Sequence, residues 1–351
     1  MANLEHRPGD EPLIGVSYVM PVLNEVSHVR AAVDSLLQQD YDGPFDVTLA
    51  LGPSIDGTTE LVAEMAAVDP RIRVVPNDIG STPAGLNIAI HASSFPVIIR
   101  VDAHSVLPSD YARIAVATLE RTGAANVGGI MDAQGELPFQ KAVARAYGSR
   151  VGLGGTPFHI GGAEGEADTV YLGCFRRSSI TAVGLFDESI KRGQDWELNR
   201  RLRESGETVW FTPDLKVLYR PRPSVARLAR QMLSTGLWRG ELARRFPAAN
   251  GLRYFIPPAT VVGTALGLVL GIVGIVVAVL GGTPWLLLGF VAPAVYLLFV
   301  IAATILVTRP DGFRAALWFL IVLPCIHFCW GSGFVLGYLK LTSNITAHTG
   351  R

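Results

Sequence analysis

Up to about Gly135, short apolar segments rich in β-branched residues alternate with longer segments whose apolar residues recur at helical spacing. The predicted strands are Ile14–Met20, Phe45–Leu51, Ile72–Val75, Val97–Val101 and Ala125–Met131. The predicted helices are Glu25–Gln38, Thr58–Ala67, one beginning near Thr82 with Ser81 as its N-cap, and Ser109–Thr122. Regular alternation of this kind predicts an α/β domain with a mainly parallel sheet and helices on its faces. Such sheets bind ligands beyond the carboxyl ends of their strands, so the turns that follow the strands are the first places to search for a site.

Beyond Gly135 the pattern is less regular. The glycine-rich stretch Gly148–Gly165 predicts a long mobile loop. After it we expect a strand at Thr169–Phe175, a helix at Asp195–Ser205 and a last short strand at Val217–Arg220.

The last hundred residues are almost free of charge. Phe255–Leu280, Trp285–Val307 and Ala315–Leu339 each exceed the roughly 20 apolar residues that cross a bilayer as a helix. Just before them, Ser224–Phe246 mixes large apolar residues with arginines, as in helices that lie at a membrane surface. We therefore expect a soluble domain over residues 1–223, a basic interfacial segment over 224–253, and a membrane domain of about three transmembrane helices over 254–351.

The charges around the apolar segments predict their orientation. Arginines flank the membrane segments at Arg244, Arg245 and Arg253 before the first and at Arg309 and Arg314 after the second. The loop Gly281–Pro284 has no charge, so the positive-inside rule places the first domain in the cytoplasm and, with three spans, the C-terminus outside. The segment Met1–Gly15 is polar and lacks the apolar core of a signal peptide, which favours the same orientation.

Composition excludes several classes of function. The 351 residues carry 30 basic and 30 acidic side chains, so the zero net charge argues against nucleic-acid binding. Three cysteines without a CxxC pair predict neither a disulfide framework nor a cysteine metal site.

Asp102 and His104 follow a buried strand at a spacing of two, which places both side chains on the same face. A carboxylate and an imidazole presented to a diphosphate suit a divalent cation, Mn²⁺ or Mg²⁺, whose other ligands are phosphate oxygens and water. The alternative is that Asp102 caps a turn and His104 is only solvated.

A second candidate, Asp195, opens a predicted helix. A carboxylate at a helix N-terminus is stabilised as the anion, and an ionised Asp can accept the proton of an attacking hydroxyl. A first-turn acidic residue without catalytic role is the alternative, and Glu197 is the alternative base.

Two turns after strands, Pro21–Glu25 and Gly52–Thr58, offer backbone amides that can hold the polar groups of a nucleotide. Each is common among α/β domains, because such turns use Pro, Asn, Asp and Gly.

These segments, in this order, resemble glycosyltransferase family 2, whose members have the GT-A fold. The matching segments are PVLNE at Pro21–Glu25, GPSIDGT at Gly52–Thr58, NDIGSTPAGLN at Asn77–Asn87, VDAH at Val101–His104, DTVYLGCFRR at Asp168–Arg177, GLFDE at Gly184–Glu188 and QDWELNRRLRESG at Gln194–Gly206. The resemblance covers residues 14–240. Within the family the chain is most similar to the succinoglycan-type membrane glucosyltransferases of bacterial exopolysaccharide biosynthesis, which share the Asp-Ala-His motif and the C-terminal spans.

The resemblance implies a role for each site residue. Pro21, Asn24 and Glu25 would lie at the nucleotide, with Asp56 beside the nucleoside. Asp102 and His104 would hold the metal and the diphosphate, and Asp195 would be the general base of a single in-line displacement that inverts the anomeric centre.

A further element, Gln231, Trp238 and Arg239, looks like a variant of the family's Gln-x-x-Arg-Trp element, which closes over donor and acceptor. Arg239 would pair with diphosphate and Trp238 would stack on a sugar. The spacing differs from that of the processive enzymes, so chain elongation is not implied.

The chain departs from the family at Gly52, where an acidic residue often contacts the base. A UDP-sugar is the expected donor, although this departure weakens the choice of nucleotide.

The leading hypothesis is an inverting, metal-dependent transfer of a hexose, glucose by resemblance, from a nucleotide sugar to a lipid-linked saccharide at the cytosolic face of a bacterial cell membrane. The alternatives are polyprenyl phosphate as the acceptor, or an inactive sugar-nucleotide-binding subunit. A transporter is disfavoured because the spans contain no acidic residue and only His327 well inside them.

Overall fold

The computed structural model describes residues 13–309 and 312–342. Most of the polar segment Met1–Gly15 lies outside the described residues. The chain divides into two compact units, of which the first comprises Met1–Met131 and Gly161–Leu218 and the second Asp132–Ile160 and Tyr219–Arg351. The predicted domain boundaries at residues 223 and 253 remain predictions, because compactness does not report where a membrane begins.

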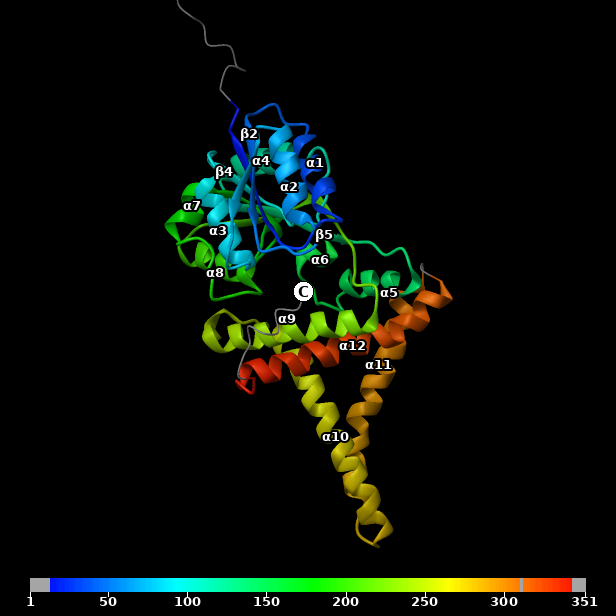
Figure 1. The fold of residues 1–351 in the computed structure, drawn as a ribbon. Coiled ribbons are helices and arrows are strands. Elements are labelled where there is room, and N and C mark those ends of the chain that lie inside the picture. The colour runs from blue at the N-terminus through cyan, green and yellow to red at the C-terminus, as the bar shows by residue number, and fades with distance from the viewer. Residues whose placement is uncertain (1–12, 310–311, 343–351) are drawn as a thin grey trace, which may run out of the picture. The chain divides into compact units, whose positions relative to one another are not determined.

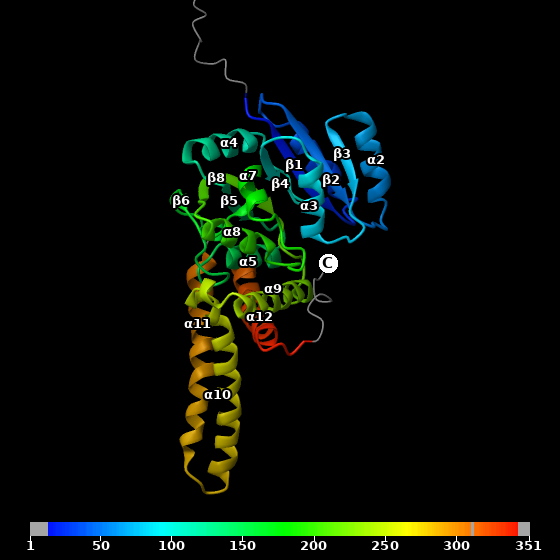
Figure 2. The ribbon, with the colours of Figure 1, turned by 90° about the vertical axis from the view of Figure 1, so that its left-hand side faces the viewer.

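The first unit is built on an eight-stranded sheet in the order β3-β2-β1-β4-β7-β5-β8-β6 (Figures 1 and 2). Its strands are β1 Val16–Val22, β2 Phe45–Leu51, β3 Ile72–Pro76, β4 Val97–Arg100, β5 Asn126–Ala133, β6 Gly165–Glu166, β7 Tyr171–Arg176 and β8 Val209–Tyr219. The four strands from β3 to β4 pair in parallel, whereas β7 pairs antiparallel with both β4 and β5. The prediction of an α/β fold with a mainly parallel sheet is confirmed, with an antiparallel part added at one side.

Helices cover both faces of the parallel strands. The helices of this unit are α1 Val29–Leu37, α2 Thr58–Val68, α3 Thr82–Ala92, α4 Tyr111–Thr122, α7 Arg177–Ala182 and α8 Gln194–Glu204. Helices α1, α2 and α4 contribute to the core on one face. Helix α3 packs closely on the other face. A Cβ at Gly85 would lie 3.0 Å from the Cβ of Pro21 on β1.

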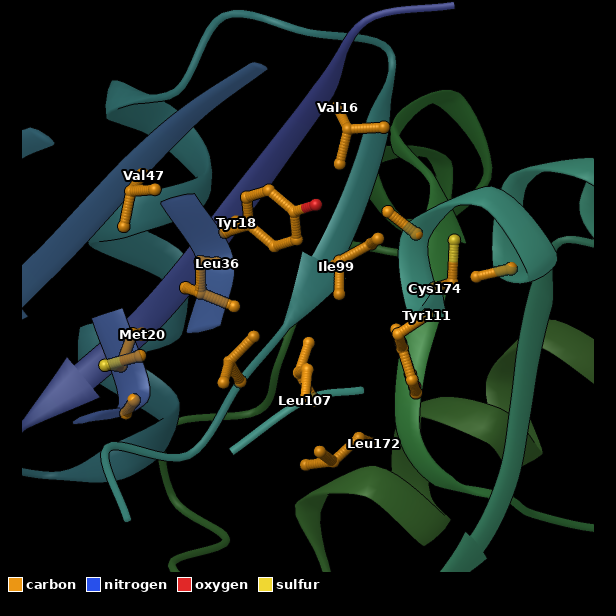
Figure 3. Close-up of a cluster of buried hydrophobic side chains, with 14 of the residues drawn as sticks. Val16, Tyr18, Met20, Leu36, Val47, Ile99, Leu107, Tyr111, Leu172 and Cys174 are labelled. Carbon is orange, nitrogen blue, oxygen red and sulfur yellow. The ribbon is translucent and has the colours of Figure 1, made fainter. Parts of the chain in front are cut away.

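The core follows from the alternation of side chains along β1. Val16, Tyr18, Met20 and Val22 all point into one buried cluster, as the period of two for a strand requires. Figure 3 shows Tyr18 among side chains from several elements of this cluster, including Leu36 of α1. Burying these apolar side chains fixes the register of the parallel strands, and thereby brings the turns after them to one edge of the sheet.

Several elements differ from their prediction. Helix α1 begins at Val29 and not at Glu25, and α7 was not predicted. The last strand, β8, begins at Val209 and has 11 residues instead of a short run from Val217. The stretch Gly148–Gly165 contains a short helix, α6 Pro157–Ile160, and the first residue of β6, while its predicted mobility is untested. Helix α5, Pro138–Tyr147, was not predicted. Its N-cap is Leu137, whose backbone N–H donates to the side-chain oxygen of Gln140.

The second unit consists of helices. Besides α5 and α6 these are α9 Val225–Arg245, α10 Ile256–Val279, α11 Val291–Val307 and α12 Phe313–Tyr338, with 3-10 turns η1 Pro247–Ala249, η2 Leu252–Phe255 and η3 Pro284–Phe290. Helices α10 and α11 form a hairpin, while α12 lies beside α9 (Figures 1 and 2). Within the described residues three helices are long and apolar enough to cross a membrane, Leu252–Val279, Pro284–Val307 and Phe313–Tyr338, as predicted.

His327, in the middle of α12, contacts two neighbours. One ring nitrogen lies 3.1 Å from the hydroxyl of Tyr296 on α11, and the other lies 2.7 Å from the carbonyl oxygen of Val151. These two contacts connect α12 to α11 and to the segment around Val151 within the second unit.

Candidate active site

The turns after β1 and β2 are hydrogen-bonded to each other. The Asn24 backbone N–H donates to Ser54 Oγ at 3.0 Å, and the Ile55 N–H donates to Asn24 Oδ1 at 2.8 Å. Asn24 has a φ of 54°, in the left-handed region that Asn tolerates better than most residues. Its backbone and its side chain therefore hold the two turns together.

Asp56 strengthens the same connection. Its carboxylate accepts hydrogen bonds from the backbone N–H groups of Val26, at 3.2 Å, and Thr58, at 3.1 Å. The Thr58 hydroxyl donates to the same carboxylate and lowers the pKa of Asp56. Thr58 Oγ1 in turn accepts from the Glu25 N–H at 2.9 Å. Asn24, Glu25 and Asp56, predicted separately, form one hydrogen-bonded edge.

Glu25 connects this edge to the turn after β4. Its Oε1 lies 3.1 Å from His104 Nδ1 and its Oε2 lies 3.3 Å from His28 Nδ1, and the Glu25 side chain is only 12% exposed. A carboxylate that accepts from one ring nitrogen orients the imidazole and leaves the other nitrogen as the ligand atom.

The predicted strand Val97–Val101 ends at Arg100, so Asp102 and His104 lie in a turn. The Ser105 N–H closes that turn by donating to the Asp102 carbonyl oxygen at 2.9 Å. Ala103 is nevertheless buried, while the side chains of Asp102 and His104 are 17% and 38% exposed. The strand therefore does not extend through these residues, and a shared face for Asp102 and His104 remains a prediction.

Arg100 is a candidate site residue that the sequence patterns did not indicate. Its guanidinium lies 2.8 Å from Asp102 Oδ1 and 3.2 Å from Asp195 Oδ2, with the side chain 7% exposed. Burial opposes its charge, but the two carboxylates outweigh burial and raise the pKa of Arg100. The signal in the sequence that could have indicated Arg100 is its spacing of two from Asp102 at the end of a strand, which favours side chains on the same face.

Asp195 is the second residue of α8, which begins at Gln194 directly after Gly193, whose φ of 84° suits glycine. Burial raises the pKa of Asp195, Arg100 opposes that rise, and Asp102 adds to it. Within the described residues Oδ1 is buried without a hydrogen-bond partner, whereas Oδ2 pairs with Arg100. One carboxylate oxygen is thus held, and the other is left to accept a proton or hydrogen bond.

The alternative base, Glu197, has another role. It is 3% exposed and pairs with Arg200 at 3.1 Å and with Arg201 at 2.8 Å. These contacts make Glu197 a structural residue of α8 and leave Asp195 as the first-turn carboxylate that faces Arg100.

Asn87, at the end of the predicted NDIGSTPAGLN segment, joins it to the GLFDE segment. Its amide donates to the Phe186 carbonyl oxygen and to Glu188 Oε1, each at 2.9 Å, and it accepts from the Phe186 N–H at 3.0 Å. Segments about a hundred residues apart are therefore bound through one buried side chain.

Gln231, Trp238 and Arg239 lie on α9 in the second unit. Gln231 Nε2 donates to the Tyr219 hydroxyl at 3.0 Å, and Trp238 is 1% exposed with its indole nitrogen unpartnered among the described residues. Arg239 bonds to Asn250 and stacks 3.7 Å above the ring of Tyr254. Burial lowers the pKa of Arg239 to about 10.

Within residues 13–309 and 312–342, no group of three or more His, Cys, Asp and Glu side chains is arranged to hold a metal ion. Asp102 and His104 fit a different kind of site, in which the protein provides two ligands and a bound diphosphate provides most of the others. The contact between Glu25 and His104 supports this fit, because it orients the imidazole as in many metal sites.

Comparison with known proteins places the chain in a family. Residues 17–177 match the family model described as Glycosyl transferase family 2. The chain is 34% identical over 257 residues to the succinoglycan biosynthesis protein ExoA of Rhizobium meliloti (strain 1021), covering 73% of this chain and 78% of that protein. The chain therefore belongs to glycosyltransferase family 2, as the motifs predicted.

More distant similarities extend this result. A Methanococcus voltae dolichyl N-acetyl-α-D-glucosaminyl phosphate 3-β-D-2,3-diacetamido-2,3-dideoxy-β-D-glucuronosyltransferase is 24% identical, over 66% of this chain and 74% of its own. Among solved structures, the mannosyltransferase PcManGT of Pyrobaculum calidifontis, in complex with GDP-Man and Mn²⁺, has a TM-score of 0.56 and 17% identity, over 93% of this chain and 86% of that chain. That likeness supports the GT-A fold.

Proposed function

We propose that this chain transfers a hexose from a nucleotide sugar to a lipid-linked saccharide at the cytosolic face of a bacterial membrane, with inversion at the anomeric carbon. The observation that carries the proposal is the Arg100 guanidinium shared between Asp102 and Asp195. Arg100 connects Asp102, which is proposed to hold the diphosphate, with Asp195, which is proposed to accept the proton of the acceptor. The two aspartates are 93 residues apart in the sequence.

The nucleotide would bind along the edge formed by Pro21, Asn24, Glu25 and Asp56. The hydrogen bonds between the two turns hold this edge rigid before the donor arrives. Rigid, preformed sites lose less conformational entropy on binding. Since Gly52 stands where family members often have an acidic residue, UDP is proposed here from the family resemblance and not from a base contact.

Asp102 and His104 would hold a divalent cation, Mn²⁺ or Mg²⁺, against the diphosphate of the donor. A bound cation of this kind neutralises the charge that develops on the departing nucleoside diphosphate. Glu25 positions His104, and Arg100 positions Asp102, so that both ligands have a fixed orientation.

Asp195 would act as the general base. Its carboxylate would accept the proton of the acceptor hydroxyl as the hydroxyl oxygen attacks the anomeric carbon and the bond to the diphosphate breaks. Positioned proton transfer contributes about 10²–10⁴ in rate. Arg100 orients the carboxylate through Oδ2 and opposes the rise of its pKa, which keeps more of it ionised.

For the acceptor side we propose Gln231, Trp238 and Arg239. Because Arg239 is bonded to Asn250 and stacked on Tyr254, its pairing with a diphosphate would require exchange of those partners. Trp238 would likewise have to become accessible before it could stack on a sugar.

Polyprenyl phosphate is the second candidate acceptor. The three helices that are apolar enough to cross a membrane suit either lipid, since anchoring raises the effective concentration of a scarce acceptor. The name of the Methanococcus relative, which includes a dolichyl sugar phosphate, supports an acceptor that already carries a sugar.

The proposal is tested by offering the purified full chain in lipid nanodiscs a panel of UDP- and GDP-sugars, with and without a chelator. We expect one donor to bind in a metal-dependent way and its sugar to appear in a lipid extract. Product formed on polyprenyl phosphate alone would favour the second acceptor. Binding without transfer to any lipid fraction would leave the inactive-subunit alternative.

A further inference from the structure

Helices α9 and α12 run in parallel, in backbone contact (Figures 1 and 2). Four glycines form the contact, and a Cβ at each would lie within 2.2 Å of a backbone oxygen of the other helix: Gly236 at Trp330, Gly240 at Phe334, Gly333 at Leu233 and Gly337 at Leu237. A contact this close over two turns leaves no room for lipid between the helices. The two helices therefore share one position relative to the membrane.

Helix α9 is too polar to cross a bilayer. Its 21 residues include five arginines and one glutamate, and it is not among the helices long and apolar enough to span. Arg239 and Glu241 lie within the segment that faces α12, and Glu241 pairs with Arg244 at 2.6 Å and Arg245 at 2.7 Å. If α12 crossed the bilayer, these charges would enter the hydrocarbon with it, which is expensive for each ionised side chain.

The other half of α12 also lies against a polar helix. The Trp318 ring packs edge-to-face on Phe139 of α5 at 5.3 Å, and α5 carries Lys141 and Arg145. Each half of α12 therefore lies against a helix that carries charged side chains.

The hairpin of α10 and α11 is different. Helix α10 meets α12 near its own start, where a Cβ at Gly331 would lie 2.6 Å from the Pro257 carbonyl oxygen. Farther along, Gly267 and Gly271 of α10 pack against η3, and only 22% of the apolar window of α10 and 17% of that of α11 is buried, against 39% for α12. The 24 residues of α10 extend about 36 Å at 1.5 Å per residue, enough for a hydrocarbon core of about 30 Å.

We propose that α10 and α11 alone cross the bilayer, and that α12 lies with α9 and α5 at the lipid interface. The apolar side chains that α12 exposes would enter the headgroup and acyl boundary, as in other interfacial helices. They are Phe313, Leu317, Trp318, Leu320, Ile321 and Tyr338. Two crossings return the chain to the face from which it entered, so Lys340 lies on the same side of the membrane as the first unit. This inference depends on the packing in the second unit and not on the proposed reaction.

The test uses single cysteines in the full chain, with Cys325 and Cys329 replaced by Ala and the buried Cys174 retained. Three exposed positions report the side of the membrane on which each part of the chain lies. Glu64→Cys reports the first unit, Thr283→Cys the loop between α10 and α11, and Lys340→Cys the end of α12. Each is treated with a membrane-impermeant maleimide in right-side-out and in inside-out vesicles. We expect Lys340→Cys to label in the same preparation as Glu64→Cys, and Thr283→Cys in the opposite one. Labelling of Lys340→Cys together with Thr283→Cys would overturn the proposal.

A depth measurement provides the second readout. The membrane depth of nitroxide labels is compared between two series of exposed positions. One series is Phe313 and Ile321 of α12 with Leu339 at its C-cap, and the other is Val262, Val269 and Val276 of α10. We expect the α10 series to be deepest at Val269 and the α12 series to remain shallow throughout. A maximum of depth at Ile321, equal to that at Val269, would contradict an interfacial α12.

Discussion

Arg100 and Asp195 form an ion pair of 3.2 Å between the end of a parallel strand and the first turn of α8. The same guanidinium pairs with Asp102 at 2.8 Å, so a single nearly buried cation separates two carboxylates that would otherwise repel each other. This relationship makes Arg100 a positioning residue for both halves of the proposed site.

Replacing Arg100 tests that role. Arg100→Gln removes charge-assisted hydrogen bonds of about 1.5–3 kcal/mol, so we expect kcat to fall about 10- to 100-fold. Arg100→Lys retains the charge without the planar fork and should recover part of the loss. Steady-state kinetics provide the measurement, with circular dichroism to confirm folding. Equal kcat values for all three proteins would show that Arg100 does not position the reacting groups.

The pH dependence follows from Asp195. Its pKa is raised by burial, so the base is ionised above that raised pKa and activity falls as the pH decreases through it. We expect the acidic limb of kcat/KM to lie above the ordinary Asp value of about 3.9. In Arg100→Gln the limb should move to still higher pH, because the charge that opposes the rise is lost. A limb that stays in place in this variant would mean that another group controls it.

Glu25 is expected to act through His104. Glu25→Gln weakens the acceptor that orients the imidazole, and losses of this kind reduce metal affinity about 10- to 100-fold. The measurement is the Mn²⁺ concentration at half-maximal donor binding. Glu60→Gln, on the exposed side of α2, is the matched control and should not change it. An unchanged midpoint in Glu25→Gln would separate Glu25 from the metal site.

Backbone contact inside the sheet predicts a stability effect. A Cβ at Gly129 of β5 would lie 1.9 Å from the Leu215 carbonyl oxygen, so Gly129→Ala should lower the free energy of unfolding of the first unit by about 1–3 kcal/mol. Gly165, in the same unit, has open space and ordinary backbone geometry, and Gly165→Ala serves as the control. Denaturant unfolding compares the two, and equal midpoints would contradict the close approach.

The parallel half of the sheet could be predicted closely because each of its strands carries its own local pattern. The strand Phe45–Leu51 was predicted with the bounds that the structure shows. The helix that begins at Thr82 was predicted with its observed N-cap, Ser81. The start of β8 was missed because Thr212, Asp214 and Lys216 interrupt the apolar run, and pairing with strands elsewhere in the sheet overrides that local pattern.

The candidate site residues could be proposed from their residue types, but the contacts between them could not be predicted. Asp102, His104 and Asp195 were proposed from spacing, order and the family resemblance, whereas the Arg100 bridge depends on a contact between residues 95 positions apart, which no local pattern encodes. The partners of Arg239 were missed for a similar reason, since Asn250 and Tyr254 lie beyond the end of the helix that carries it.

The most direct measurement uses Asp195→Asn in the full chain, with donor binding and sugar transfer to lipid measured on the same nanodisc sample. The account predicts donor affinity within about twofold of the unsubstituted protein and transfer reduced by about 10² or more. Asp102→Asn should instead lose metal-dependent donor binding. Transfer at the normal rate in Asp195→Asn would contradict the account.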